Sequence, residues 1–230
     1  MAVFMFGRSA VPFAAKDIFS ENTWQDIATA CQLNKIPVTW AIGDQKTMTI
    51  GGAEYVIDII GKNHDTYSDG TGVAPLTFQL HDCLPSKYQM NVGEHNDGGW
   101  LESDMRLTTF YTIYNQLPIE VRRNLRQVNK VSSTGHERTT LNTAQDTLFL
   151  LSEIEIYGEI PLTVGGEGKQ YAYYANGGST VKKVKNSASS WWQRSPFKGN
   201  PTLFCTVSSS GVYNYEPANE SHGVSPAFCF

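Results

Sequence analysis

The sequence has little charge for its length. Only 17% of its 230 residues are Asp, Glu, Lys or Arg, whereas a typical soluble domain has roughly 25%. The net charge is −4, and the absence of a basic excess argues against a nucleic-acid-binding surface. No apolar run reaches the length of about 18 residues that a membrane-spanning helix needs. We therefore predict neither a nucleic-acid partner nor a membrane span.

The N-terminus lacks the pattern of a secretory signal. The apolar run at residues 1–6 ends at Gly7, and no basic residue precedes it. A secretory signal has a positively charged start followed by roughly 7–15 apolar residues. If the protein acts outside the cell, we therefore expect it to leave by lysis or as part of a particle.

Cysteine is scarce and shows no metal-binding pattern. The four cysteines form no Cys-x-x-Cys pair and no zinc-ligand spacing with histidine. We expect buried free thiols, as is usual for a protein made in a reducing compartment. The alternative is a Cys205–Cys229 bridge, because both residues lie in expected C-terminal strands.

Aromatic residues, in contrast, are abundant. They make up 12% of the chain, with 11 Tyr, 11 Phe and 5 Trp. A chain of this composition buries enough apolar surface to fold, which excludes intrinsic disorder. Low charge and many tyrosines together predict a polar, uncharged surface that contacts a partner through hydroxyls, amides and rings.

The apolar pattern predicts helices and strands in separate stretches of the chain, which favours an α+β fold. Helical spacing of apolar residues predicts a helix over 24–34, and Thr23 with Asp26 matches a capping box. Further helices are expected from Ser103 and from Pro118. Strands are expected at 38–42, 47–50 and 55–60 (joined as a hairpin by Gly51-Gly52), 76–80, 128–132, 147–151 and 203–207.

Nine short motifs then occur in order along the chain. They are Trp40-Ala-Ile-Gly-Asp44, Asn63-His64-Asp65, Leu76-Thr-Phe-Gln-Leu80, Gly99-Trp100 with Ser103-Asp-Met-Arg106, Leu117-Pro118, Leu148-Phe-Leu-Leu-Ser152, Glu167-Gly-Lys-Gln-Tyr171, Trp191-Trp-Gln-Arg-Ser-Pro196 and Gly223-Val-Ser-Pro-Ala-Phe228. Over residues 38–230 the set resembles a family of domains of unassigned function found in gut bacterial surface proteins and prophage structural proteins. That family is similar to the C-type-lectin-like fold of the variable proteins of diversity-generating retroelements.

This resemblance implies a C-type-lectin-like domain at residues 37–230, with short antiparallel strands and two to three helices. Residues 1–36, which contain one short helix, would form an N-terminal docking segment. In the motif at 191–196, the two tryptophans are expected to be scaffold residues, and Arg194 is expected to pair with a buried carboxylate. Gln193 departs from the family, which usually has an aliphatic residue there, so the packing of this strand is in question.

The predicted contact surface lies at residues 213–222, just before the last strand. Its candidate ligand-binding residues are Tyr213, Asn214, Tyr215, Asn219, Glu220 and His222. Tyrosine, asparagine and serine are the residues that antibody binding loops use, and the corresponding stretch binds ligands in the retroelement variable proteins. The alternative is an ordinary exposed loop. The tyrosines at 171, 173 and 174 are expected to extend the same face.

No cofactor, metal or catalytic residue is predicted for this site. Sugar-binding C-type lectins hold calcium through a Glu-Pro-Asn or Gln-Pro-Asp tripeptide. Here the sequence at 216–219 is Glu-Pro-Ala-Asn, and the extra residue argues against that mode of binding. Asp65 and Asp69 are expected to form turns.

The resemblance implies a fold and not by itself a function. We expect a non-enzymatic virion surface protein of a bacteriophage or prophage, made in the bacterial cytoplasm and carried on the particle, because the sequence lacks a secretory signal, forms nearly a single domain and has an expected polar, aromatic face. It would be a lectin-like module for head decoration or tail-tip receptor binding, contacting host glycans or other surface ligands. Its N-terminal segment would dock on other virion proteins, and the protein would be a homo-oligomer. The alternatives are a metal-dependent enzyme using His64, Asp65 and His95, or a bacterial surface adhesin.

Overall fold

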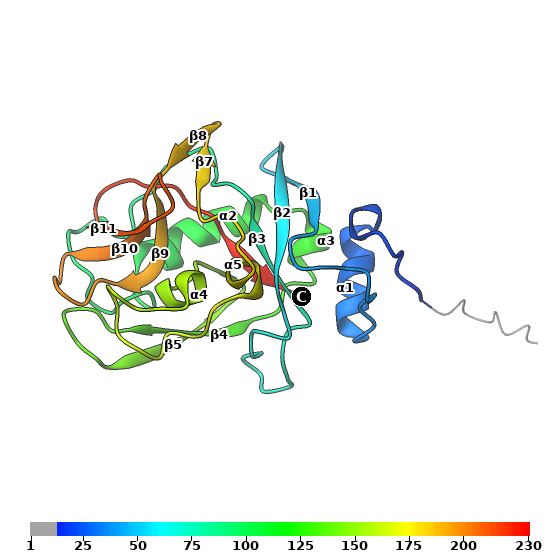
Figure 1. Cartoon of the computed structure of the whole chain (residues 1–230), viewed down its shortest axis with the longest axis horizontal. Coiled ribbons are helices and arrows are strands. Elements are labelled where there is room, and N and C mark those ends of the chain that lie inside the picture. Colours follow the sequence, from blue (N-terminus) through cyan, green and yellow to red (C-terminus); the bar gives the residue numbers. More distant parts are fainter. Residues whose placement is uncertain (1–12) are drawn as a thin grey trace, which may run out of the picture.

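A computed structural model describes residues 13–230 of the chain (Figure 1). Its helical elements are η1 (Phe19–Glu21), α1 (Trp24–Gln32), the π-helical turn η2 (Met105–Thr109), α2 (Phe110–Gln116), α3 (Ile119–Arg122), α4 (Glu153–Tyr157) and α5 (Ala172–Ala175). Its strands are β1 (Gln45–Ile50), β2 (Ala53–Lys62), β3 (Leu76–Leu80), β4 (Val128–Ser133), β5 (Leu141–Asp146), β6 (Leu148–Phe149), β7 (Lys182–Val184), β8 (Ser187–Ser189), β9 (Trp191–Pro196), β10 (Leu203–Val207), β11 (Tyr213–Pro217) and β12 (Ala227–Cys229).

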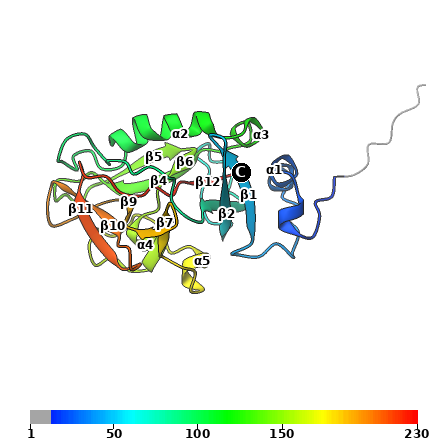
Figure 2. The same cartoon turned by 90° about the horizontal axis from the view of Figure 1, so that it is seen from above.

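The strands form four small sheets, and every pairing between named strands is antiparallel. The largest sheet has the order β1-β2-β3-β12-β6, and a second has the order β11-β10-β9. The pairs β4-β5 and β7-β8 stand alone. Figure 1 shows α1 at one end of the molecule and β9–β11 at the other, and Figure 2 shows α2 and α5 on opposite sides. The predicted α+β class is confirmed.

The N-terminal helix α1 is part of the main hydrophobic core. Thr23 and Asp26 form the predicted capping box, and the apolar face of the helix is buried. The Trp24 ring packs edge-on against Phe78 and Phe228, with ring centroids 5.8 and 6.2 Å apart. The apolar side of the helix is therefore already occupied within the chain. The docking role of residues 1–36 stays a prediction, and residues 1–12 of that segment lie outside the described residues.

The predicted hairpin at residues 47–60 is confirmed. Gly51 and Gly52 connect β1 to β2 with φ angles of 57° and 87°, a left-handed conformation that glycine adopts without steric cost. The strand expected at 38–42 is wrong, because these residues form a turn. Gly43 has φ 90°, and the buried Trp40 ring donates to the Lys16 carbonyl at 3.0 Å rather than joining a ladder.

The strand β9 carries the motif at 191–196 and is buried along its whole length. Trp191 and Trp192 both have no exposed surface, and each indole nitrogen donates to a backbone carbonyl, of Thr180 at 3.0 Å and of Tyr88 at 2.7 Å. This matches the expected scaffold role, because buried indole N–H groups need partners.

Two further predictions concern the state of the cysteines and a membrane-spanning helix. All four cysteines lie in the described part of the chain, and each is a free, buried thiol. The alternative bridge between Cys205 and Cys229 is therefore absent. Among residues 13–230, no helix has the length and apolar character that crossing a membrane would require.

Gln193, the departure from the family pattern, sits in β9 with no exposed surface. Within residues 13–230, neither atom of its side-chain amide has a hydrogen-bond partner. A buried polar group without a partner costs about 1–3 kcal/mol. The strand thus forms despite this residue and not because of it.

Replacing Gln193 with leucine should therefore stabilise the protein. Leucine has a similar volume and carries no polar atoms, so Gln193→Leu should raise the free energy of unfolding by about 1 kcal/mol or more. Urea denaturation followed by tryptophan fluorescence measures this value. A lower free energy of unfolding for the variant would show that the amide has a stabilising partner.

Candidate functional site

The predicted contact segment at 213–222 begins as a strand, where the sequence suggested a loop. Residues 213–217 form β11, which pairs with β10 in the register Cys205↔Tyr215. The turn before it is closed by the Gly211 amide, which donates to the Ser208 carbonyl at 2.9 Å. Successive side chains of a strand point to opposite faces. The pairing therefore divides the predicted surface into two faces.

One face of β11 carries exposed tyrosines that lie against two further aromatic rings. Tyr213 is 40% exposed and packs edge-on against Tyr157, with centroids 5.7 Å apart. Tyr215 is 43% exposed and stacks on Phe197, with centroids 4.3 Å apart and an interplanar angle of 16°. We call Tyr157, Tyr213, Tyr215 and Phe197 the aromatic row. It joins the edge strand, the end of α4 and the residue after β9.

Two members of the aromatic row, Tyr157 and Phe197, are tied to neighbouring segments by hydrogen bonds. The Tyr157 hydroxyl donates to the Gly211 carbonyl at 3.1 Å, which ties α4 to the turn before β11. Phe197 is held by its own backbone amide, which donates to the Leu203 carbonyl at 3.0 Å. The segments that carry these two rings are therefore already ordered before a partner binds, which lowers the entropy cost of contact.

The other face of β11 carries the polar candidates. Asn214 donates its side-chain amide to Glu216 at 2.9 Å, and Glu220 and His222 lie near Glu216. Asn219 is half-buried, and its carbonyl accepts a hydrogen bond from the Gln89 side chain. His222 is buried, with 8% of its surface exposed. The predicted residues thus divide into an outward aromatic set and a polar set on the reverse side.

The tyrosines at 171–174 do not extend this surface, so that expectation is wrong. Tyr171 has no exposed surface and Tyr174 is 6% exposed, and the half-buried Tyr173 packs edge-on against Tyr174, with ring centroids 5.0 Å apart. The Tyr174 hydroxyl donates to the side chain of Gln79 at 2.6 Å, in the core. The segment that looked like an exposed excursion folds back as α5 against β2.

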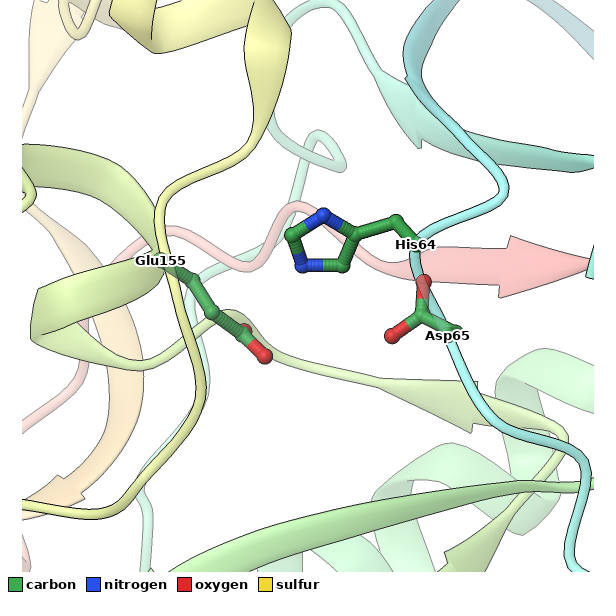
Figure 3. Close-up of side chains that lie close together, drawn as sticks. All are labelled: His64, Asp65 and Glu155. Carbon is green, nitrogen blue, oxygen red and sulfur yellow. The ribbon is translucent and has the colours of Figure 1, made fainter. Parts of the chain in front are cut away.

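Two residues of the alternative metal site, His64 and Asp65, lie close together. Figure 3 shows His64, Asp65 and Glu155 directed toward a common space, and their ligand atoms lie within 4.8 Å of one another. His95, the third predicted ligand, is exposed and belongs to neither group of possible metal ligands found in residues 13–230. His64 stacks on the ring of Tyr171, with centroids 3.9 Å apart.

A lysine of the chain occupies the place between the two carboxylates. Lys130 Nζ lies 2.8 Å from Asp65 Oδ1 and 2.6 Å from Glu155 Oε1. Arg194 donates to both oxygens of Glu155, at 2.5 and 3.0 Å. We call Asp65, Lys130, Glu155 and Arg194 the buried charge cluster. Its two positive and two negative charges balance, so the cations that the carboxylates need are supplied by the protein itself.

The pKa values follow from these partners. Burial alone would raise the pKa of Asp65, but Lys130 outweighs it and lowers the value to about 2. Burial likewise opposes the ionisation of Glu155, but Arg194 and Lys130 hold its pKa below the ordinary value. Both carboxylates are therefore ionised at neutral pH and paired with cations. The expected pairing of Arg194 with a buried carboxylate is confirmed, whereas Asp65 serves as an ion-pair partner rather than as a simple turn residue.

Glu167 is a third buried carboxylate beside this cluster. Its Oε1 accepts from the Ser133 amide at 2.7 Å and its Oε2 from the Ser195 hydroxyl. Burial raises its pKa from 4.5 to about 7, despite these hydrogen bonds and the nearby Arg194. A cleft of about 310 Å³ is lined by His64, Glu167 and the buried charge cluster.

Replacing the Glu167 carboxyl with an amide should change how the stability of the protein depends on pH. In the folded chain the Glu167 carboxyl stays protonated up to about pH 7, whereas an ordinary glutamate loses its proton near pH 4.5. The free energy of unfolding therefore falls as pH rises through that window, by about 1.4 kcal/mol per pH unit at most. The Glu167→Gln variant has no carboxyl at this position to ionise, so its free energy of unfolding does not fall in this way. Relative to the native protein, its free energy of unfolding should therefore increase between pH 4.5 and 7. Urea denaturation across that range measures the difference. A constant or decreasing difference would contradict the buried position of Glu167.

The comparisons with known proteins give a family but no function. No curated protein and no solved structure matches the chain. A family model described as a domain of unknown function, DUF6273, matches residues 76–230, about two thirds of the sequence. This region runs from β3 to β12 and contains the aromatic row and three members of the buried charge cluster. The chain therefore belongs to the DUF6273 family.

Proposed function

We propose that the chain is a non-enzymatic, lectin-like binding module on the surface of a bacteriophage or prophage particle, and that the aromatic row is its contact surface. The observation that carries this proposal is the exposure of Tyr213 and Tyr215 on an edge strand, beside Tyr157 and Phe197. Most other large aromatic side chains are used in the core, including four tryptophans with no exposed surface.

The chemistry of the aromatic row suits a carbohydrate. Tyrosine offers a flat apolar ring that stacks on the C–H face of a sugar, together with a hydroxyl that donates or accepts hydrogen bonds. Its side chain has few rotatable bonds, so little entropy is lost on contact. The aromatic row is short, because only two of its rings come from β11. A row of this length favours a short stretch of glycan, or an extended surface ligand of similar shape.

A C-type-lectin-like fold is part of the proposal. Small antiparallel sheets, short helices and long connecting loops support it. The motif tryptophans Trp40, Trp100, Trp191 and Trp192 are all fully buried, as scaffold residues of a shared fold should be. In that fold the contact surface is built on a strand core that stays constant.

The particle setting is supported by the resemblance of the nine motifs to prophage structural proteins. Docking on other virion proteins through residues 1–36 would use the polar side of α1, because its apolar side packs on β3 and β12. Self-association of the module on a symmetric particle belongs to the same proposal. Both head decoration and tail-tip receptor binding agree with these features.

The aromatic row can be tested by binding to a glycan array. The full chain should bind a defined subset of bacterial surface glycans, and Tyr213→Ala and Tyr215→Ala should each weaken that binding at least tenfold. Such a loss is about 1.4 kcal/mol, within the usual range for an aromatic contact residue. Both side chains are exposed, so the variants should remain folded.

The matched control is Tyr111→Ala, which removes a tyrosine that is 69% exposed on α2. It should leave binding unchanged. If binding survives both changes on β11, or if Tyr111→Ala weakens it equally, the contact surface lies elsewhere.

A further inference from the structure

A second group of ligand-type side chains lies on the face of β11 opposite the aromatic row. It consists of Glu216 at the end of the strand, and Glu220 and His222 in the segment that follows. One ligand atom from each of the three lies within 4.8 Å of the other two. The turn between them is closed by the Glu220 amide, which donates to the Pro217 carbonyl at 2.9 Å.

His222 has the arrangement of a metal-binding histidine. Its Nδ1 lies 2.6 Å from the Ser190 hydroxyl oxygen, and its ring packs edge-on against Trp192 at 4.8 Å. With Nδ1 as donor to Ser190, the lone pair lies on Nε2. Metal-bound histidines are oriented in this way by a hydrogen bond from the other ring nitrogen.

The Nε2 atom of His222 is buried and has no hydrogen-bond partner among residues 13–230. It lies 3.7 Å from Glu220 Oε2, beyond hydrogen-bond distance. Two backbone hydrogen bonds with Tyr88, of 2.9 and 3.0 Å, hold His222 in place. With Nδ1 as the donor, the Nε2 lone pair has no hydrogen-bond partner among the described residues and lies among the ligand atoms of Glu216 and Glu220.

The carboxylates also differ from those of the buried charge cluster. There, Lys130 and Arg194 supply the positive charge. Among the ion pairs of residues 13–230, neither Glu216 nor Glu220 has a lysine or arginine within 4.0 Å. Asn214 holds one oxygen of Glu216 at 2.9 Å, which leaves the other oxygen free to bind a cation.

The distances suit a small divalent ion. Zinc binds histidine nitrogen and carboxylate oxygen at about 2.0–2.2 Å, which places neighbouring tetrahedral ligands about 3.5 Å apart. The separation of 3.7 Å between His222 and Glu220 is close to this value. Glu220 is exposed and can move to complete the geometry. Imidazole with carboxylates favours Zn²⁺ over Ca²⁺ or Mg²⁺, which prefer oxygen ligands alone.

We propose that Glu216, Glu220 and His222 bind one Zn²⁺ ion. The ion fastens the turn at 217–222 to the sheet, and the three protein ligands leave a fourth position for water. This site is independent of the proposed function, because it lies on the reverse face of the strand. It was not expected from the sequence, where Glu220 and His222 were read as contact residues.

The test uses the full chain after treatment with a chelator and removal of the chelator. Isothermal titration with Zn²⁺ should show one ion bound per chain, and Zn²⁺ should raise the melting temperature. Glu220→Gln and His222→Gln should each weaken binding at least tenfold. Glu220 is exposed, so its variant stays folded even if His222→Gln does not. Titration with Co²⁺ should show tetrahedral absorption bands without the intense charge-transfer band of a cysteine thiolate.

The matched control is His136→Gln, which removes an exposed histidine beside Asp97. It should leave Zn²⁺ binding unchanged. The proposal is overturned if no Zn²⁺ binds, if Glu220→Gln binds as the native chain does, or if a thiolate band appears. It is also overturned if His64→Gln, rather than Glu220→Gln, abolishes binding. None of these results bears on the glycan array, since Tyr213 and Tyr215 are untouched.

Discussion

The ion pairs of Glu155 with Lys130 and Arg194 constrain the rest of this fold. The three residues come from α4, β4 and β9, and Lys130 adds Asp65 from the loop after β2. Each buried ion costs several kcal/mol unless its partner is in place. Four distant segments must therefore meet in one register. The buried charge cluster therefore fixes how these four segments are placed relative to one another.

The edge strand β11 of this scaffold carries two different sets of side chains. β11 pairs on one side only, and its alternating residues serve two different surfaces. Tyr213 and Tyr215 face outward in the aromatic row, whereas Asn214 and Glu216 face the turn that contains His222. One short strand thus carries the proposed contact surface and, on its reverse face, the proposed zinc site.

Local sequence signals predicted local structure well. The capping box at Thr23, the hairpin at Gly51-Gly52 and the buried Trp strand were all visible, and a second capping box at Ser152 was present but overlooked. Lys130 and Glu155 were missed because their partners lie 25 to 65 positions away, and no spacing rule connects such residues. β11 was missed because its composition is that of a loop, and its pairing with β10 alone makes it a strand. Tyr157 and Phe197 were absent from the predicted surface because they lie on other elements, far from β11 in the sequence.

The central claim is that the chain stands on a particle with the aromatic row facing outward. Tyrosine nitration of intact, purified particles, followed by peptide mass spectrometry, tests it most directly. The account predicts that the chain is present, that Tyr213 and Tyr215 are modified, and that the buried Tyr171 and Tyr174 are not. Absence of the chain from particles would contradict the account. So would particles in which Tyr213 and Tyr215 stay unmodified although both react in the isolated protein.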